Sequence, residues 1–272
     1  MRDLPIAAEA ARLDAATDLA LARSVVYHAV TLGLRPPALE SACASFDSAA
    51  PETLRAAATL LDAHAPSGEA LLPAVETFCA LAPSPADRRA AHGRLFGHSR
   101  GVVCPFETEY GAEGAFRQPQ ELADISGTYL AFGLRPPEGG DERVDHAACE
   151  CEFMDFLARK ETYALGSLPA SEDQEEVREQ LATVQGAARG FLREHLGRFG
   201  RAFASLLIKE DAGGFHGALG ALLFRFLTQE CQRFGLPPGP PSLELRPPVP
   251  DDTPMACGRS DPLIQIQRRP RP

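Results

Sequence analysis

Residues 122–161, LADISGTYLAFGLRPPEGGDERVDHAACECEFMDFLARKE, contain the pattern that decides the fold. Apolar residues first recur at helical spacing, and Gly133 with the Pro-Pro pair beyond it forms a helix stop signal. After a loop rich in glycine and proline, helical spacing resumes at Asp145, which stands where an N-cap belongs. The pattern therefore predicts a helix over about 119–132, a loop, and a second helix from Asp145 to about Ala164.

The same helical spacing extends over most of the 272 residues. Alanine, leucine, arginine and glutamate, which favour helices, are abundant, whereas valine, isoleucine and threonine are sparse. A long amphipathic helix is expected over 5–33, where Gly33 and two following prolines end it. Further helices are expected over residues 38–46, 52–65, 69–82, 85–96, 201–210 and 215–234. Together these segments predict an all-α, single-domain bundle of about nine or ten helices over residues 1–236.

Local start signals set several helix boundaries. Ser84-Pro85-Ala86-Asp87 combines an N-cap, a proline in the first turn and an acid on the helix dipole. Ser171-Glu-Asp-Gln174 reads as a capping box for a helix that reaches about residue 194. A break near Gly197 or Gly200 should follow. Residues 98–117 lack periodicity and predict an ordered loop.

The composition changes after residue 236. PPGPPSLELRPPVPDDTP, residues 237–254, is proline-rich and cannot sustain a helix. The final segment, LIQIQRRPRP, is basic. We expect residues 237–272 to form an extended or disordered tail that is dispensable for folding.

The negative charge is concentrated in one part of the chain. The net charge is -10, and residues 105–155 hold twelve acidic side chains against three arginines, a net of -9. Such a stretch disfavours nucleic acid as a partner and suits a basic peptide, because complementary fields steer encounter. An alternative interpretation is a solvated helix face.

No membrane segment is expected. No run of eighteen apolar residues occurs, and acids interrupt the apolar N-terminal stretch at helical intervals. The sequence therefore predicts a cytoplasmic protein without stable membrane insertion.

Signatures of catalysis and cofactor binding are also missing. The sequence has no phosphate loop, dinucleotide fingerprint, HExxH zinc motif or GxSxG elbow, and its seven cysteines are scattered. His146, Cys149 and Cys151 come nearest to a metal site, but Cys151 lies well around the helix from His146. We expect no enzyme activity, no metal and no cofactor. A metal or redox carrier that uses the two cysteines remains an alternative.

The start of the second helix places polar and apolar groups together. His146 and Glu150 are four residues apart, so the carboxylate should raise the pKa of the imidazole. Phe153 and Leu157 continue that face as an apolar patch. An ordinary capped helix with a surface ion pair is the alternative interpretation.

This segment resembles the TorD/DmsD/NarJ family of redox-enzyme maturation chaperones. The resemblance extends to Arg23-Ser-Val-Val-Tyr27, to His92-Gly-Arg-Leu-Phe96 with the loop after it, and to Phe191-Leu-Arg-Glu-His195-Leu196, so that roughly residues 15–235 follow the family's order. One departure is Val144, where many members have proline. The matching positions in the quoted segment are Tyr129, Phe132-Gly133, Asp145-His146, Glu150, Glu152, Phe153-Met154 and Lys160-Glu161.

The resemblance implies a helical holdase without catalytic groups. Its partner would be the catalytic subunit of a molybdopterin-dependent oxidoreductase, bound at a twin-arginine signal peptide during cofactor insertion and before export. The identity of the client and the oligomeric state, monomer or dimer, stay open. A small-ligand or nucleotide-regulated binding protein is the alternative function. The residues expected to bind the client are Asp145, His146, Glu150, Glu152, Phe153, Met154, Tyr129, Phe132, Glu107 and Tyr110.

Overall fold

The computed structural model describes residues 3–36, 50–65, 68, 70–97, 101–111, 117–135 and 143–247. Within these ranges the regular structure is helical, and the all-α prediction is confirmed. The helix expected over 38–46 lies outside the described residues. The helices are α1 (Asp3–Leu34), α2 (Ala50–Ala63), α3 (Leu72–Ala80), α4 (Pro85–Phe96), α5 (Gln118–Ala131), α6 (Ala147–Ser167), α7 (Gln174–Glu194), α8 (Leu196–Glu210) and α9 (Phe215–Arg233), with 3-10 turns η1 (Glu107–Glu109) and η3 (Leu168–Ala170).

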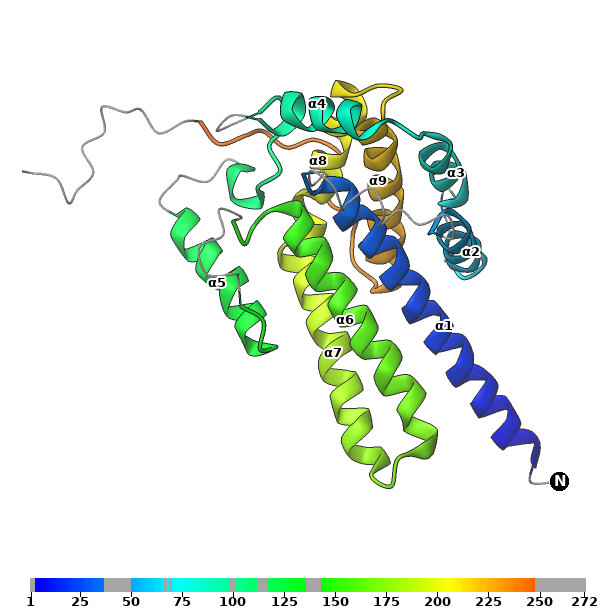
Figure 1. Ribbon diagram of the computed structural model, residues 1–272. Helices are drawn as coiled ribbons and strands as arrows, with labels where there is room; N and C mark the ends of the chain where they lie inside the picture. The colour runs from blue at the N-terminus through cyan, green and yellow to red at the C-terminus, as the bar shows by residue number, and fades with distance from the viewer. Residues whose placement is uncertain are drawn as a thin grey trace, which may run out of the picture.

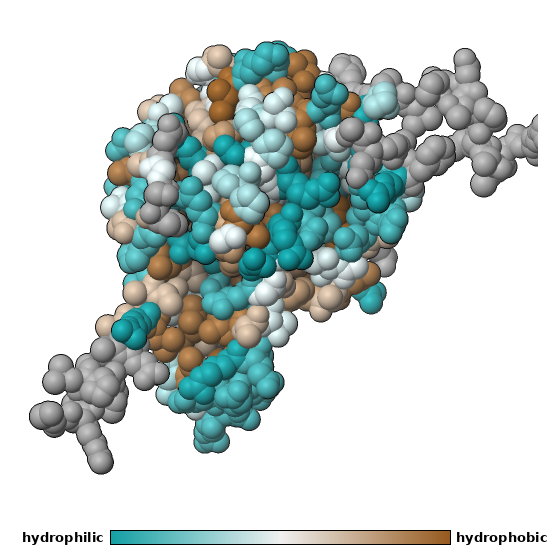
Figure 2. Space-filling model, turned by 180° about the vertical axis from the view of Figure 1, so that it is seen from behind, coloured by the Kyte–Doolittle hydropathy of each residue, from teal (hydrophilic) through white to brown (hydrophobic). Residues whose placement is uncertain are grey.

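Two helix pairs organise the bundle. α1 packs along α6, and α8 packs against α9, while α7 lies beside α6 (Figure 1). α2 and α3 lie on one flank, α5 lies on the opposite flank, and α4 crosses one end. The N-terminal part of α1 diverges from α6 and α7, and apolar surface is visible between them from behind (Figure 2). The bundle thus surrounds one continuous core.

A buried ionic cluster joins three of these helices. Arg23 of α1 contacts Glu161 of α6 (Nη1–Oε2, 2.6 Å) and Glu230 of α9 (Nε–Oε2, 2.9 Å). The Tyr27 hydroxyl also donates to Glu230, at 3.1 Å. Because a buried charge is costly unless it is paired, this cluster fixes the relative positions of α1, α6 and α9.

The helix starts test the capping predictions. The Ser84 hydroxyl accepts from the amide of Asp87 at 3.1 Å, so the predicted cap of α4 is confirmed. The capping box at Ser171 is wrong, because Asp173 caps α7 by accepting from the amide of Glu176 at 3.0 Å. The N-cap is the residue at which the backbone turns into the helix. Ser171 and Asp173 both have side chains that can cap a helix, and the sequence alone does not show at which of them this turn occurs.

The break between α7 and α8 falls at His195, and not at the two glycines predicted for it. Gly197 and Gly200 both lie inside α8. A Cβ on Gly200 would lie 2.5 Å from Leu227 Cδ1. This glycine therefore permits close packing of α8 on α9 and does not interrupt the helix.

Residues 236–247, here called the strap, run extended over the bundle. The amide of Gly111 donates to the Glu244 carbonyl, and the amide of Arg246 donates to the Glu109 carbonyl, both at 2.8 Å. The Arg246 side chain is only 6% exposed and contacts Glu121 (Nη2–Oε1, 2.8 Å). An extended course was one of the two predicted for the tail. The packing of the strap leads us to expect that this part of the tail contributes to stability, whereas the sequence suggested that residues 237–272 are dispensable.

Truncation should separate the strap from the rest of the tail. A chain ending at Gly235 should lose about 1–3 kcal/mol in its free energy of unfolding, since Arg246 and the packed Leu243 are removed. A chain ending at Pro247 keeps both residues and should retain more stability than the shorter one. Urea unfolding of the two truncated chains measures the difference. Equal midpoints would mean that the strap contributes nothing.

Candidate functional site

The loop before α6 is held by a guanidinium–carboxylate clamp. Arg143 contacts Asp145 through two nitrogens (Nε–Oδ1, 3.0 Å; Nη2–Oδ2, 2.8 Å) and Glu109 through a third (Nη1–Oε1, 3.0 Å). Its guanidinium lies over the Phe106 ring, 4.2 Å from the centroid. The amide and hydroxyl of Thr108 donate to Asp145 as well, at 3.2 and 2.7 Å. Asp145 therefore ties the 101–111 loop to the start of α6.

The N-cap of α6 is His146, and the prediction of Asp145 as the cap is wrong. Nδ1 of His146 accepts from the amide of Ala148 at 3.0 Å, while Asp145 is fully buried in the clamp. Burial lowers the pKa of the His146 imidazole to about 4, although the neighbouring Asp145 acts in the opposite direction. A neutral ring is what the cap requires, because only an unprotonated Nδ1 accepts a hydrogen bond.

Glu150 does not form the surface ion pair with His146 that the alternative interpretation proposed. Its side chain is fully buried, and neither carboxyl oxygen has a hydrogen-bond partner among the described residues. Burial, reinforced by the neighbouring Glu107, raises the pKa of Glu150 well above its usual range. The expected rise in the pKa of the imidazole is also wrong, since burial dominates at both positions. Burial therefore favours the protonated, uncharged form of Glu150 inside the bundle.

Most of the described acids of the acidic stretch lie next to a basic side chain of the protein itself. Eight of the twelve acids in residues 105–155 are described, and seven of these lie within 4 Å of an arginine or histidine nitrogen. Glu150, the eighth, is the buried acid above. The described acids thus form internal contacts, and they do not present one broad acidic surface. The pairs are Glu107–His195, Glu109–Arg143, Glu121–Arg246, Asp124–His195, Asp145–Arg143, Glu152–Arg35 and Asp155 with both Arg159 and His28.

A groove of about 510 Å³ lies between the end of α1, the end of α5 and the first half of α6. We call it the α5–α6 groove. Aromatic rings pack together here: Tyr129 lies 4.9 Å and Phe156 lies 6.3 Å from Phe153, centroid to centroid. Charged groups surround this apolar part, among them Glu152, which is half exposed. The groove is lined by Arg35, Tyr129, Leu134, Arg135, Val144, Cys149, Glu152, Phe153, Asp155, Phe156 and Arg159.

The structure divides the residues that were expected to form one client site. Tyr129, Glu152 and Phe153 line the α5–α6 groove, and Phe132 packs beside it on the Phe153 and Phe156 rings. Met154 points into the core and is fully buried. Apolar character alone could not separate the groove face of α6 from its core face. The sequence interpretation missed Arg35, Leu134, Arg135 and Phe156, although Phe156 lies three residues beyond Phe153 on the same helix.

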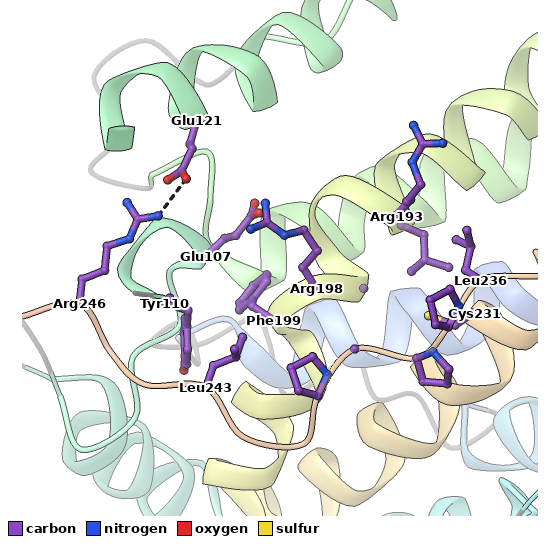
Figure 3. Close-up of a pocket in the computed structure, with 17 residues that line it drawn as sticks. Glu107, Tyr110, Glu121, Arg193, Arg198, Phe199, Cys231, Leu236, Leu243 and Arg246 are labelled. Carbon is purple, nitrogen blue, oxygen red and sulfur yellow. Dashed lines mark hydrogen bonds and ion pairs between the residues drawn. The ribbon is translucent and has the colours of Figure 1, made fainter. Parts of the chain in front are cut away.

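Glu107 and Tyr110 belong to a different pocket, of about 400 Å³ (Figure 3). The strap, η1 and the junction of α7 and α8 enclose it, and the Arg246–Glu121 ion pair closes one side. The Tyr110 hydroxyl donates to the Cys104 carbonyl at 2.6 Å, so this ring is held within the loop. We call this cavity the strap pocket.

Comparison with known proteins identifies the family. A family model described as nitrate reductase delta subunit matches residues 47–205, more than half of the chain. The chain belongs to this family. Searches of curated proteins and of solved structures each return no match.

The nitrate reductase delta family, of the NarJ/TorD type, consists of chaperones for molybdoenzyme maturation. Membership in this family supports the resemblance and implies a molybdoenzyme subunit as the partner. The matched range includes the Arg143 clamp and all the groove residues except Arg35. The site described here therefore lies within the part of the chain that defines the family.

Two observations bear on the other interpretations. The described residues contain no group of three or more histidine, cysteine or acidic side chains that could hold a metal ion, and Cys151 is fully buried. The carrier alternative therefore lacks a ligand set in this part of the chain. None of the described helices combines the length and the apolarity needed to cross a bilayer.

Replacing Glu150 by glutamine should remove a pH dependence of stability. Above the ordinary pKa of glutamate, 4.5, the folded protein keeps a proton on Glu150 that the unfolded chain releases, so stability falls as pH rises. Glu150→Gln should therefore gain stability relative to wild type between pH 5 and pH 8. Urea unfolding at both pH values measures this, with the half-exposed Glu152→Gln as control. A difference from wild type that is the same at both pH values would show that Glu150 is ionised in the fold.

Proposed function

We propose that this protein is a chaperone that holds the catalytic subunit of a molybdenum-containing oxidoreductase by an arginine-bearing apolar segment. The twin-arginine signal peptide of the precursor is the segment proposed, with binding in the cytoplasm before export and during cofactor insertion. The observation that supports this most strongly is the α5–α6 groove, where an aromatic floor adjoins the half-exposed carboxylate of Glu152.

The groove suits the two chemical parts of such a segment. A guanidinium group can make two parallel hydrogen bonds to the Glu152 carboxylate, which strengthens and orients the contact. Apolar side chains that follow it can pack on the partly exposed Phe156, which rests on the buried rings of Tyr129 and Phe153, since aromatic rings bury large apolar area. Each part alone is common on protein surfaces, and their juxtaposition gives the selectivity proposed here.

The buried polar residues have a supporting role in this proposal. The Tyr129 hydroxyl donates to the Val144 carbonyl at 3.1 Å, which joins the α5 wall of the groove to the loop held by Arg143. Asp145, His146 and the buried Glu150 thus position the walls and do not contact the client. This supporting role takes the place of the direct client contacts that the sequence led us to expect of these three residues.

The small-ligand or nucleotide alternative has weaker support. Three arginines line the groove and would suit an anion, but Arg35 and Arg159 are paired with Glu152 and Asp155. Of these three arginines, only Arg135 has no ion pair with another described residue. Its single charge is a small part of what binding a polyphosphate needs.

Calorimetry with a short peptide that carries two arginines followed by leucines tests the proposal. Phe156→Ala should weaken binding about tenfold, which corresponds to 1.4 kcal/mol, because it removes part of the apolar floor. Tyr163→Ala is the matched control, since Tyr163 is on the same helix, 79% exposed and outside the groove. Glu152→Gln should weaken binding, whereas the remote Glu175→Gln should not.

Two changes of condition complete this test. Affinity should fall as salt rises, and it should fall when both arginines of the peptide are replaced by lysine, which cannot make a bidentate contact. Equal binding by Phe156→Ala, Glu152→Gln and wild type would overturn the groove as the binding site, whereas no binding by wild type would overturn the proposed function.

A further inference from the structure

The carboxylate proposed to receive a client arginine already holds an arginine of the protein itself. Arg35, the first residue after α1, contacts Glu152 of α6 at 2.5 Å between Nη2 and Oε2. The two side chains are 117 positions apart in the chain and meet at the rim of the α5–α6 groove. Both are partly open to solvent, with exposed fractions of 38% for Arg35 and 53% for Glu152.

This contact is weaker than a guanidinium–carboxylate pair can be. Only one nitrogen of Arg35 contacts Glu152, and its Nε is buried without a hydrogen-bond partner among the described residues. A bidentate pair would use two nitrogens and both carboxylate oxygens. Partly exposed single-contact pairs contribute little to stability, so exchange of this partner has a low cost.

The other carboxylate of the groove is held differently. Asp155 is only 9% exposed and accepts from the Ser24 hydroxyl at 2.5 Å and from Arg159 Nε at 2.8 Å, with His28 Nδ1 at 3.3 Å. Three partners from two helices fix it, and no incoming group could replace all of them. Glu152 is therefore the groove carboxylate that is free to change partners.

We propose that Arg35 is an internal competitor that occupies Glu152 until an arginine of the client displaces it. This inference rests on the proposed function, because it assumes that the client brings a guanidinium group to the groove. Glu152 stays paired before and after binding, so the exchange leaves no unpaired carboxylate beside the aromatic floor. The client arginine can form the second contact that Arg35 does not make. Arg35 thereby sets the affinity below the value that Glu152 alone would allow, which favours later release of the client.

The test compares variants by calorimetry at low salt with the two-arginine peptide. Arg35→Gln should bind the peptide about two- to fivefold more tightly than wild type, the range expected for removal of an exposed pair. Arg135→Gln is the matched control, because it removes one positive charge from the same groove without freeing a carboxylate. Arg35→Lys should fall between Arg35→Gln and wild type, since lysine keeps the charge as a weaker competitor.

The double variant Arg35→Gln with Glu152→Gln distinguishes exchange from other effects. If Arg35 acts by occupying Glu152, the double variant should bind no more tightly than Glu152→Gln alone. A gain from Arg35→Gln no larger than that from Arg135→Gln would assign the effect to overall charge and overturn the inference. Weaker binding by Arg35→Gln would make Arg35 a client contact and overturn it too. In both cases loss of binding in Glu152→Gln and Phe156→Ala would still support the proposed function.

Discussion

The contact of Arg143 with Asp145 is the constraint on which the site depends. A fully buried carboxylate is tolerated only when its charge is paired and its oxygens are hydrogen-bonded, and Arg143 and Thr108 provide both. The clamp holds residues 143–146 just before α6, where His146 caps the helix and the Val144 carbonyl accepts from the Tyr129 hydroxyl. The clamp and the Tyr129–Val144 hydrogen bond thus connect the α5 wall of the groove to the start of α6. Loss of Arg143 would leave a buried charge unpaired and would release both walls together.

The acidic stretch shows how charge in a sequence differs from charge on a surface. A net of -9 over residues 105–155 suggests a strong field that attracts basic partners. In the fold, the described acids contact arginines and histidines of α1 and the residue after it, of the α7–α8 junction, of the strap, and of α6 with the residues before it. Much of their charge is used to join elements, and at the groove itself Glu152 and Asp155 lie among three arginines. Recognition of a client then depends on a defined carboxylate and an apolar floor rather than on bulk attraction.

The sequence correctly predicted features that depend only on residues close together in the chain. Helical spacing located the long helices, and the Ser84 signal identified a true cap, because both act within a few residues. The partners of Glu152 and Glu121 could not be predicted, since Arg35 and Arg246 are 117 and 125 positions away. The burial of Glu150 was equally hidden, because spacing places a side chain on a helix face without showing what covers that face. An extended course was one of the two predicted for the tail, but its partners on the bundle could not be predicted from proline content.

We infer that the client occupies the α5–α6 groove while the polar cluster behind it supports the walls. Hydrogen–deuterium exchange of the whole chain, with and without the two-arginine peptide, locates the binding site. Protection on binding should concentrate in residues 129–135 and 144–159, with little change in 193–199 and 236–247. Protection confined to the latter two segments would place the client in the strap pocket and contradict the claim.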